Sequence, residues 1–359
     1  MSNLSSSIWP QLLRLSKSPR WLIKKSRKKE AKQSLIRIRN SETVEEEIWE
    51  IENIFKHAPS PIKNSGAGNL LLMMFKSRSV RRALMVGCGI QLFAEFSGVN
   101  TIIYYSGIII QMSGVGDMTT VIWNTVIINF INLTFAIVGV WLVDRVGRRT
   151  LAIVGLLGLS VSSCCLGTIF LMATKYSPWI NTTDGLLNST CSLYSYCDDC
   201  IRDPLCGFCY ENKPNVNNGA CLPVSDVSYL ISKAGACNST LTLSKYSMKW
   251  AYDYCPVPFT WVAIVGLAFF LMFCAPAIGP LPWTINAEIY PLWARSIGNG
   301  IGSMTCLVSN LIVSVTFLSV IEAIHNYGVF YVMASVAVSH LIVSIYLSIY
   351  LSIYLNKFY

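Results

Sequence analysis

The sequence contains few charged residues. Asp, Glu, Lys and Arg make up 13% of its 359 residues, whereas they make up about a quarter of an average soluble domain. Hydrophobic residues make up 53% of the chain, and its mean hydropathy is +0.49. This scarcity of charge excludes an ordinary soluble domain and indicates a chain that lies largely in lipid.

Lysine and arginine are almost missing from the long apolar stretches. Of the 28 basic residues, 17 precede Ala83. Proteins that bind nucleic acids present basic residues on a surface that faces the phosphates, but most of the basic residues here precede a hydrophobic segment, where membrane topology accounts for them. The net charge of +9 therefore does not indicate nucleic-acid binding.

Two further features are missing. Residues 1–15 lack the early basic region of a signal peptide, and Pro10 and Arg14 interrupt their short apolar run. We therefore expect the start of the chain to be cytosolic. Nucleophiles, bases and metal ligands do not occur with catalytic spacing, so we expect neither an enzyme nor a bound cofactor or metal.

Six segments reach the length of about 20 apolar residues that a helix needs to cross a bilayer. They are residues 83–112, 119–143, 151–173, 259–287, 296–320 and 328–355. Six crossings return the chain to the side on which it started. Basic residues in short loops mark the cytoplasmic side, and the turns at Arg145 and Arg295 share a side with both ends of the chain. We predict that this side is cytosolic, in the plasma membrane or a membrane of the secretory pathway.

The long stretch 174–258 falls on the opposite side. It carries glycosylation sequons at Asn181, Asn188 and Asn238. It also holds eight of the thirteen cysteines: Cys191, Cys197, Cys200, Cys206, Cys209, Cys221, Cys237 and Cys255. An even number of cysteines in an oxidising compartment predicts disulfides and leaves their pairing open. A zinc site on the two Cys-x-x-Cys pairs is the less favoured alternative, because only five residues separate the pairs.

Residues 24–57 are rich in charge. Their apolar residues recur at helical spacing: Leu35, Ile38, Ile48, Ile51 and Ile54. We expect short amphipathic helices in a cytosolic segment 1–82, three spans in 83–173, an extracellular module in 174–258, and three spans with a short tail in 259–359. The predicted fold class is an all-α membrane protein with six transmembrane helices and a small disulfide-rich module.

Two of the spans are interrupted. Transporters built from repeats form substrate sites on helices broken near mid-membrane, and Gly or Pro at corresponding positions is the sequence pointer. Ser97 and Gly98 break the first span, and residues 276–283 break the fourth. The polar and aromatic side chains near these breaks suit a polyhydroxyl substrate: Gln91, Glu95, Asn100, Tyr104, Tyr105, Asn132 and Trp283. The alternative for a single amide is a hydrogen bond between helices.

Two ionisable residues lie within the spans. An ionisable group there is a functional hypothesis by default, so Glu95 is interpreted as a proton carrier or as a protonated hydrogen-bonding group. His340 lies among aliphatic residues, and we favour a packing role. The cysteines within spans are interpreted as small apolar packing residues: Cys88, Cys164, Cys165, Cys274 and Cys306.

Four motifs, in order, resemble the sugar-porter branch of the major facilitator superfamily. Residues 18–22 are similar to the motif after that family's sixth helix, 87–106 to its seventh helix, 144–149 to the loop after its eighth, and 279–295 to its tenth helix and the next turn. The cysteine-rich run 196–210 is similar to the plexin-semaphorin-integrin type module of the family's proton-coupled myo-inositol cotransporters.

The resemblance implies a polyol or sugar carrier, most similar to a proton-coupled myo-inositol symporter. It implies that the chain is the C-terminal half of such a carrier and is inactive alone. It implies a small polyol or hexose, H+ and the lipid bilayer as partners, with the substrate contacts supplied by Gln91, Asn100, Asn132 and Trp283. Tyr104 and Tyr105 would gate the outer side. The inner gate would consist of Asp144, Arg145, Arg148, Arg149, Glu288 and Arg295.

The sequence departs from the family at two pairs of positions. Ala94 and Glu95 stand where the family has paired glutamines, and Cys306 and Leu307 stand where it has an Asn-Trp pair in the eleventh helix. These departures leave the identity of the polyol or sugar open. The competing hypothesis is a non-transporting surface protein, in which the disulfide-rich module binds a partner and the spans serve as an anchor.

Overall fold

The computed structural model describes residues 18–24, 26–40, 43–56, 67–181, 190–213, 216, 218–226, 228–238, 247–291 and 293–355. The chain divides into two compact units. The first comprises residues 1–84 and 288–299, and the second comprises residues 85–287 and 300–359. The predicted sequon at Asn188 lies outside the described residues.

The first unit contains short helices. These are α2 (Pro19–Lys24), α3 (Lys28–Arg39), α4 (Glu45–Lys56) and α5 (Ala67–Lys76). Helices α3 and α4 bury Leu35 and Ile48 together, and an exposed ion pair between Lys32 and Glu45 joins them. This confirms the amphipathic helices that the sequence predicts between residues 24 and 57. Ile38 is an exception, because it is exposed.

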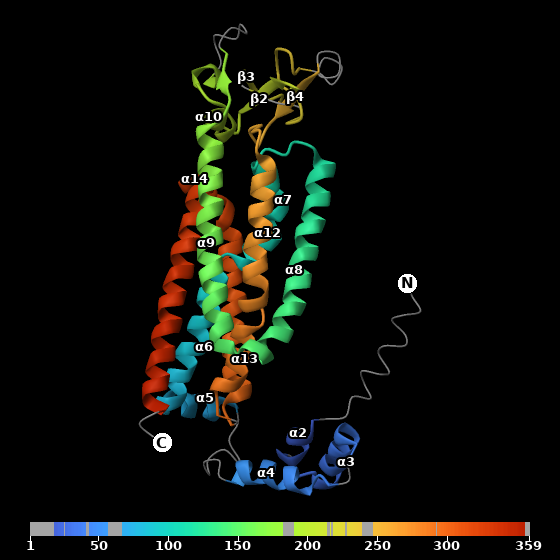
Figure 1. The fold of residues 1–359 in the computed structure, drawn as a ribbon, viewed down its shortest axis with the longest axis vertical. Helices are drawn as coiled ribbons and strands as arrows, with labels where there is room; N and C mark the ends of the chain where they lie inside the picture. Colours follow the sequence, from blue (N-terminus) through green and yellow to red (C-terminus); the bar gives the residue numbers. More distant parts are fainter. Residues whose placement is uncertain are drawn as a thin grey trace. The chain divides into compact units, whose positions relative to one another are not determined.

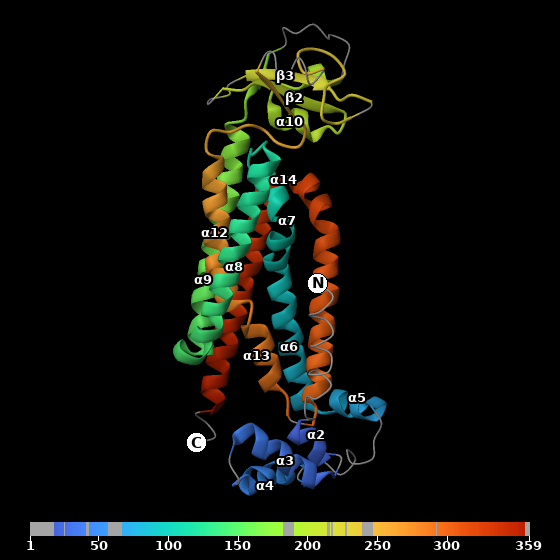
Figure 2. The ribbon, with the colours of Figure 1, turned by 90° about the vertical axis from the view of Figure 1, so that its right-hand side faces the viewer.

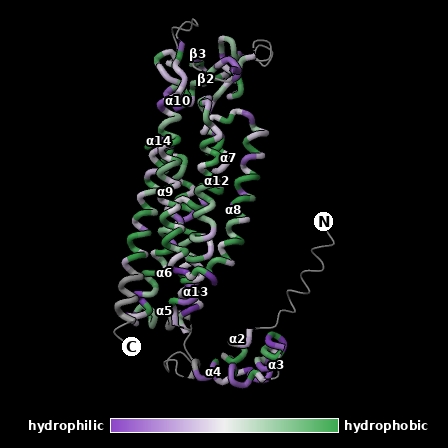
Figure 3. Tube along the Cα trace, in the orientation of Figure 1, coloured by the Kyte–Doolittle hydropathy of each residue, from purple (hydrophilic) through white to green (hydrophobic). Residues whose placement is uncertain are grey.

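The second unit is a helical bundle that carries a small module at one end (Figures 1 and 2). The bundle helices are α6 (Arg78–Phe96), α7 (Val99–Met112), α8 (Met118–Val146), α9 (Arg148–Lys175), α12 (Thr260–Ala277), α13 (Leu281–Ile289) and α14 (Arg295–Leu355). Figure 3 shows that hydrophobic residues line these helices along most of their length. Helices α8 and α9 lie very close to α12, because Gly139 packs against the backbone of Pro276 and Gly155 against Ala277.

The structure does not confirm six separate spans. In the described residues, five helical segments are long and apolar enough to cross a membrane. The stretch labelled α14 consists of two helices that meet at a kink at His325 (φ 63°, ψ 162°), and the last two predicted spans lie on either side of this kink. Figure 2 shows that α14 forms two arms that meet at one end. One residue turns the chain there, so the expected loop 321–327 is not formed.

Both predicted helix breaks are present. Gly98 adopts a φ of 83° between α6 and α7, a conformation that glycine accommodates without steric cost. A Cβ atom at this position would also collide with the sulfur of Met333. Residues 278–280 separate α12 from α13. Each break leaves a short helix after it that carries predicted substrate residues.

The module between α9 and α12 is built on a four-stranded sheet. Its strands are β1 (Trp179–Ile180), β2 (Cys206–Glu211), β3 (Asn218–Pro223) and β4 (Met248–Ala251), in the order β1-β3-β2-β4. Strand β2 pairs antiparallel with both β3 and β4, and β1 pairs parallel with β3. Helix α10 (Cys197–Arg202) and the turn η2 (Thr190–Leu193) complete it.

The eight cysteines of the module form four disulfides, as the sequence predicts. The pairs are Cys191–Cys206, Cys197–Cys255, Cys200–Cys221 and Cys209–Cys237. With Phe208 and Tyr254, most of these cysteines form the core of the module. A module this small buries too little apolar surface to be stable without such cross-links. The cysteines therefore bond to one another in the structure, as the disulfide interpretation expects.

The module is joined to the bundle at the turn of α14. Arg202 at the end of α10 approaches Nε2 of His325 at 3.2 Å and donates to the carbonyl of Glu322 at 3.3 Å. Burial raises the pKa of the nearby Asp198 carboxyl, against the opposing attraction of His325. The loop between α7 and α8 also meets the module, since Gly116 lies against the hydroxyl of Tyr254.

The close packing of Gly139 predicts that adding one methyl group at this position destabilises the protein. A Cβ atom at this position would overlap the backbone of Pro276, so Gly139→Ala forces α8 away from α12. We expect a loss of about 1–3 kcal/mol in the free energy of unfolding, measured by denaturant titration in detergent micelles. Gly89→Ala is the matched control, because its Cβ would meet nothing within 4 Å. An equal loss in both variants would contradict this packing.

Candidate functional site

A buried carboxylate links the first broken helix to α14. Glu95, at the end of α6, is only 6% exposed. Its two oxygens accept hydrogen bonds from the amide of Asn100 at 2.9 and 3.0 Å. The amide of Asn310 donates to Oε2 at 3.0 Å, and the thiol of Cys306 donates to Oε1 at 3.1 Å. We call Glu95, Asn100, Cys306 and Asn310 the carboxylate cluster.

The local sequence explains this geometry. The break at Ser97 and Gly98 places Asn100 in the first turn of α7, so that its amide reaches back to the end of α6. Cys306 and Asn310 are four residues apart on α14, and residues at this spacing lie on the same face of a helix. The cluster therefore joins three helices through one side chain.

The cluster surrounds a carboxylate with neutral donors. Among the described residues, no lysine or arginine lies within ion-pair distance of Glu95. Asn100 and Asn310 are only half-buried, so their outer faces remain accessible beside the buried carboxylate. An amide that donates to Glu95 still has its own oxygen to accept a hydroxyl group. This arrangement is suited to bind a polyhydroxyl molecule.

Helices α7 and α14 make a second contact about one turn beyond the carboxylate cluster. The hydroxyl of Tyr105 donates to the carbonyl of Ser314 at 2.9 Å, and its ring packs on Phe317 with centroids 4.7 Å apart. Tyr104, by contrast, is 63% exposed. The two predicted gate tyrosines therefore have different surroundings, because they lie on different faces of α7.

The other predicted substrate residues lie apart from the carboxylate cluster. Gln91 is 1% exposed, and its Nε2 has no hydrogen-bond partner. Asn132 is half-buried in the middle of α8, and Trp283 is exposed on α13. Within the described part of the chain, none of the three hydrogen-bonds to the cluster. Of the predicted substrate residues, the structure thus brings only Glu95 and Asn100 into direct contact within the described part of the chain.

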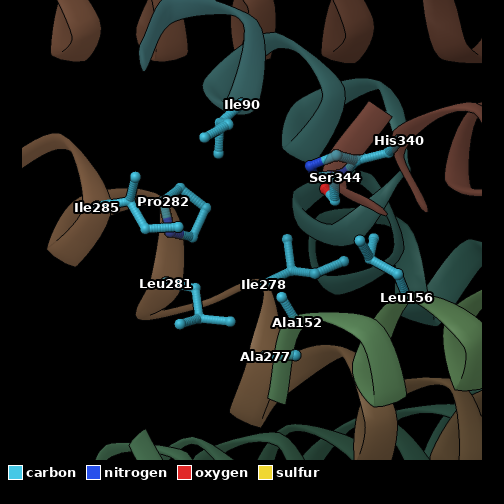
Figure 4. Close-up of a pocket in the computed structure, with 10 residues that line it drawn as sticks. All are labelled: Ile90, Ala152, Leu156, Ala277, Ile278, Leu281, Pro282, Ile285, His340 and Ser344. Atoms are coloured by element: carbon cyan, nitrogen blue, oxygen red, sulfur yellow. The ribbon is translucent and has the colours of Figure 1, made fainter. Parts of the chain in front are cut away.

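A separate small pocket lies beside the break between α12 and α13 (Figure 4). Its lining is mainly apolar and includes Ile278, Leu281 and Pro282, with His340 and Ser344 as its polar residues. His340 stacks on Phe93, with ring centroids 5.3 Å apart, which agrees with the predicted packing role. The predicted substrate residues do not line this cavity, and its apolar walls do not suit a polyol.

The charged residues of the predicted inner gate lie at helix ends. Asp144 and Arg145 end α8, and Arg148 and Arg149 begin α9 after Gly147. The guanidinium of Arg145 lies 4.4 Å from the ring centre of Trp141. Glu288 and Arg295 belong to the other unit, and the ion pairs that would join the two sets stay a prediction.

Sequence reasoning missed two members of the carboxylate cluster. Asn310 was not selected, and Cys306 was interpreted as an apolar packing residue. The polar residues Cys306, Asn310 and Ser314 recur at intervals of four along an otherwise apolar helix. That periodicity was the available signal, because it predicts one polar face on the eleventh-helix segment.

Comparisons with known proteins agree with this fold and site. The family model described as "Sugar (and other) transporter" matches residues 7–187 and 235–350. The human proton myo-inositol cotransporter is 42% identical over 90% of this chain and 50% of its own length. The probable inositol transporter 2 of Arabidopsis thaliana is 33% identical over 91% of this chain and 57% of its own length.

A solved structure supports the fold. The proton:xylose symporter XylE, a protein of the major facilitator superfamily, was solved with bound 6-bromo-6-deoxy-D-glucose. It matches with a TM-score of 0.59 at 20% identity, over 92% of this chain and 51% of that one. The chain spans about half the length of the curated relatives that it matches.

The protein is a multi-pass membrane protein with the fold of a major-facilitator sugar transporter. The chain belongs to the sugar transporter family. The human and Arabidopsis thaliana relatives named above carry the names of inositol transporters. The family is a class of transporters and not a class of enzymes. These matches do not favour the competing hypothesis of a non-transporting surface protein.

The contact between Tyr105 and Ser314 predicts a stability difference. Tyr105→Phe keeps the ring on Phe317 but removes the hydroxyl that donates to the carbonyl of Ser314. We expect a loss of about 0.5–1.5 kcal/mol in the free energy of unfolding in micelles. Tyr104→Phe removes an exposed hydroxyl and is expected to change it by less than about 0.5 kcal/mol. A larger loss in Tyr104→Phe than in Tyr105→Phe would contradict a stabilising hydrogen bond between Tyr105 and Ser314.

Proposed function

We propose that the protein carries a polyol or sugar across a membrane, with proton-coupled symport of myo-inositol as the specific activity. The observation that supports it most strongly is the carboxylate cluster beside the break between α6 and α7. Substrate sites of repeat-built transporters form at such breaks, and the cluster offers amides to a polyhydroxyl ligand. The 42% identity to a proton myo-inositol cotransporter supports the same substrate.

The proposed substrate contacts are Gln91, Glu95, Asn100, Asn132 and Trp283. The unpaired Nε2 of Gln91 is a donor that a substrate hydroxyl could satisfy, and a buried donor without a partner is costly. Asn132 has both donor and acceptor atoms to offer. The exposed indole of Trp283 offers an apolar face to the ring carbons of a cyclic polyol, together with one N–H donor.

The proposed gates lie on either side of this site. Tyr104 and Tyr105 would close the outer side, since α7 leads from the cluster toward the end of the bundle that carries the module (Figure 2). Charged residues at helix ends would close the inner side through ion pairs: Asp144, Arg145, Arg148, Arg149, Glu288 and Arg295. Opposite charges that pair in one state and separate in the other can bias an equilibrium between states.

The proposed topology places the module outside the cell or in the secretory lumen, with both chain ends in the cytosol. The four disulfides support it, because disulfides persist in oxidising compartments. The organisation predicted from the sequence, with its cytosolic segment 1–82, the two sets of spans and the extracellular module 174–258, follows from this topology.

Binding of myo-inositol tests the proposed site. We expect saturable binding of labelled myo-inositol to the purified chain in lipid nanodiscs, weakened about 5- to 10-fold by Asn132→Ala, as expected for one lost hydrogen bond of about 1 kcal/mol. Asn129→Ala is the matched control on the same helix, because the amide of Asn129 donates to the carbonyl of Thr125. Failure of the parent chain to bind myo-inositol would refute the proposed substrate.

Glycosylation tests the proposed topology. Asn238 is exposed on the module, and Asn181 lies directly after β1. When the chain is made in cells, we expect an enzyme that removes N-glycans to lower its mass, and Asn238→Gln to remove one increment of that shift. Asn132→Gln is the control, because that sequon lies within α8 and cannot reach the glycosylation machinery. If the module carries no N-glycan, it does not lie on the lumenal side, and the proposed topology is refuted.

A further inference from the structure

The hydrogen bonds of the carboxylate cluster lead to an inference that rests on the proposed transport function and deepens it. We propose that Glu95 is a proton-binding site of the carrier, and that Asn100 responds to the proton by turning its amide. A proton then changes which atoms the cluster presents to a substrate.

The surroundings of Glu95 make its charge costly. The residue is 6% exposed, and within the described part of the chain its carboxylate accepts hydrogen bonds from the neutral donors of Asn100, Cys306 and Asn310. A buried charge that no opposite charge compensates is unfavourable, even when hydrogen bonds support it. Uptake of one proton removes the charge at the point where the helices α6, α7 and α14 meet.

The cluster can also satisfy the protonated form. A neutral carboxyl group gains an O–H donor and needs an acceptor. The oxygen of Asn310 faces the hydroxyl of Ser314, although that contact is long at 3.5 Å. Asn100 has no such second contact among the described residues, so it is the amide that can turn. Its half-turn exchanges NH2 for oxygen, and the new O–H of Glu95 donates to that oxygen.

This rearrangement links the proton to the substrate. With Glu95 ionised, Asn100 directs NH2 to the carboxylate and its oxygen to the accessible side of the cluster. With Glu95 protonated, Asn100 presents NH2 on the accessible side and can donate to a substrate hydroxyl. The step adds one proton from solvent to a carboxylate oxygen and breaks no covalent bond. Proton and substrate therefore bind as linked events.

Helices α7 and α14 also carry the titratable side chains of Cys306, Tyr105 and His340. Cys306 belongs to the cluster itself. The hydroxyl of Tyr105 is engaged by the carbonyl of Ser314, and His340, on the second arm of α14, stacks on Phe93. Among the described residues, neither Tyr105 nor His340 hydrogen-bonds to Glu95. The carboxyl is therefore the group of the cluster that exchanges the proton.

Infrared spectroscopy of the purified full chain in nanodiscs tests the inference. On lowering the pH from about 8 to about 5, we expect one C=O band of a protonated carboxyl group to appear. Glu95→Gln should abolish it. Glu322→Gln is the control, because Glu322 is an exposed glutamate on α14, whereas Glu95 is buried at the end of α6, and this variant should retain the band.

A second readout does not depend on changing Glu95. The S–H stretch of Cys306 absorbs where proteins have few other bands, and Cys306→Ala identifies it. Because the thiol donates to Glu95, its frequency should shift together with the carboxyl band. If the parent spectrum contains no band that Glu95→Gln removes, and the S–H stretch stays constant with pH, the inference is overturned.

The same experiment separates this inference from the proposed function. Addition of myo-inositol should change both bands if the proton site and the substrate site are one. Bands that respond to pH but not to myo-inositol would support Glu95 as a proton site and contradict the proposed substrate site.

Discussion

Every break in a helix that lies in lipid exposes backbone groups that must find partners within the protein. The two broken helices of this protein meet that constraint in different ways. At the first break, the amide of Gly98 donates to the carbonyl of Glu95, and α7 restarts with Ile102 donating to Gly98. At the second, Ile278 donates to Cys274, and Thr284 donates to the carbonyl of Pro280. The positions of the candidate site residues follow from these breaks.

The first break is stabilised by side chains as well as by the backbone. Glu95 links the end of α6 to α7 and α14 through its hydrogen bonds to Asn100, Cys306 and Asn310. Its neighbour Ala94 is buried in the apolar core, so the polar role of the pair falls on Glu95. The thiol of Cys306 and the amide of Asn310, one turn apart on α14, donate to the same carboxylate.

The module follows a different physical rule from the bundle. Its sheet is small, and its core consists mainly of cystines and a few aromatic residues. Disulfides therefore stabilise the module, whereas hydrophobic burial stabilises the bundle. The two parts meet at the turn of α14, where Arg202 contacts His325 and the carbonyl of Glu322. The conformation of a single residue, His325, thus both reverses the chain and offers the module a point of attachment.

The sequence by itself determined the membrane class, the long helices, both breaks and the cysteine-rich module, because hydropathy, Gly and Pro positions and cysteine counts are local properties. It also singled out Glu95 and Asn100, which lie near one break. Only the tertiary structure decided the disulfide pairing, the sharp kink at His325 between the last two helices, and the contacts of Glu95 with Cys306 and Asn310. Those two partners are 211 and 215 residues distant along the chain. Such contacts depend on how whole helices pack, and no local pattern encodes that packing.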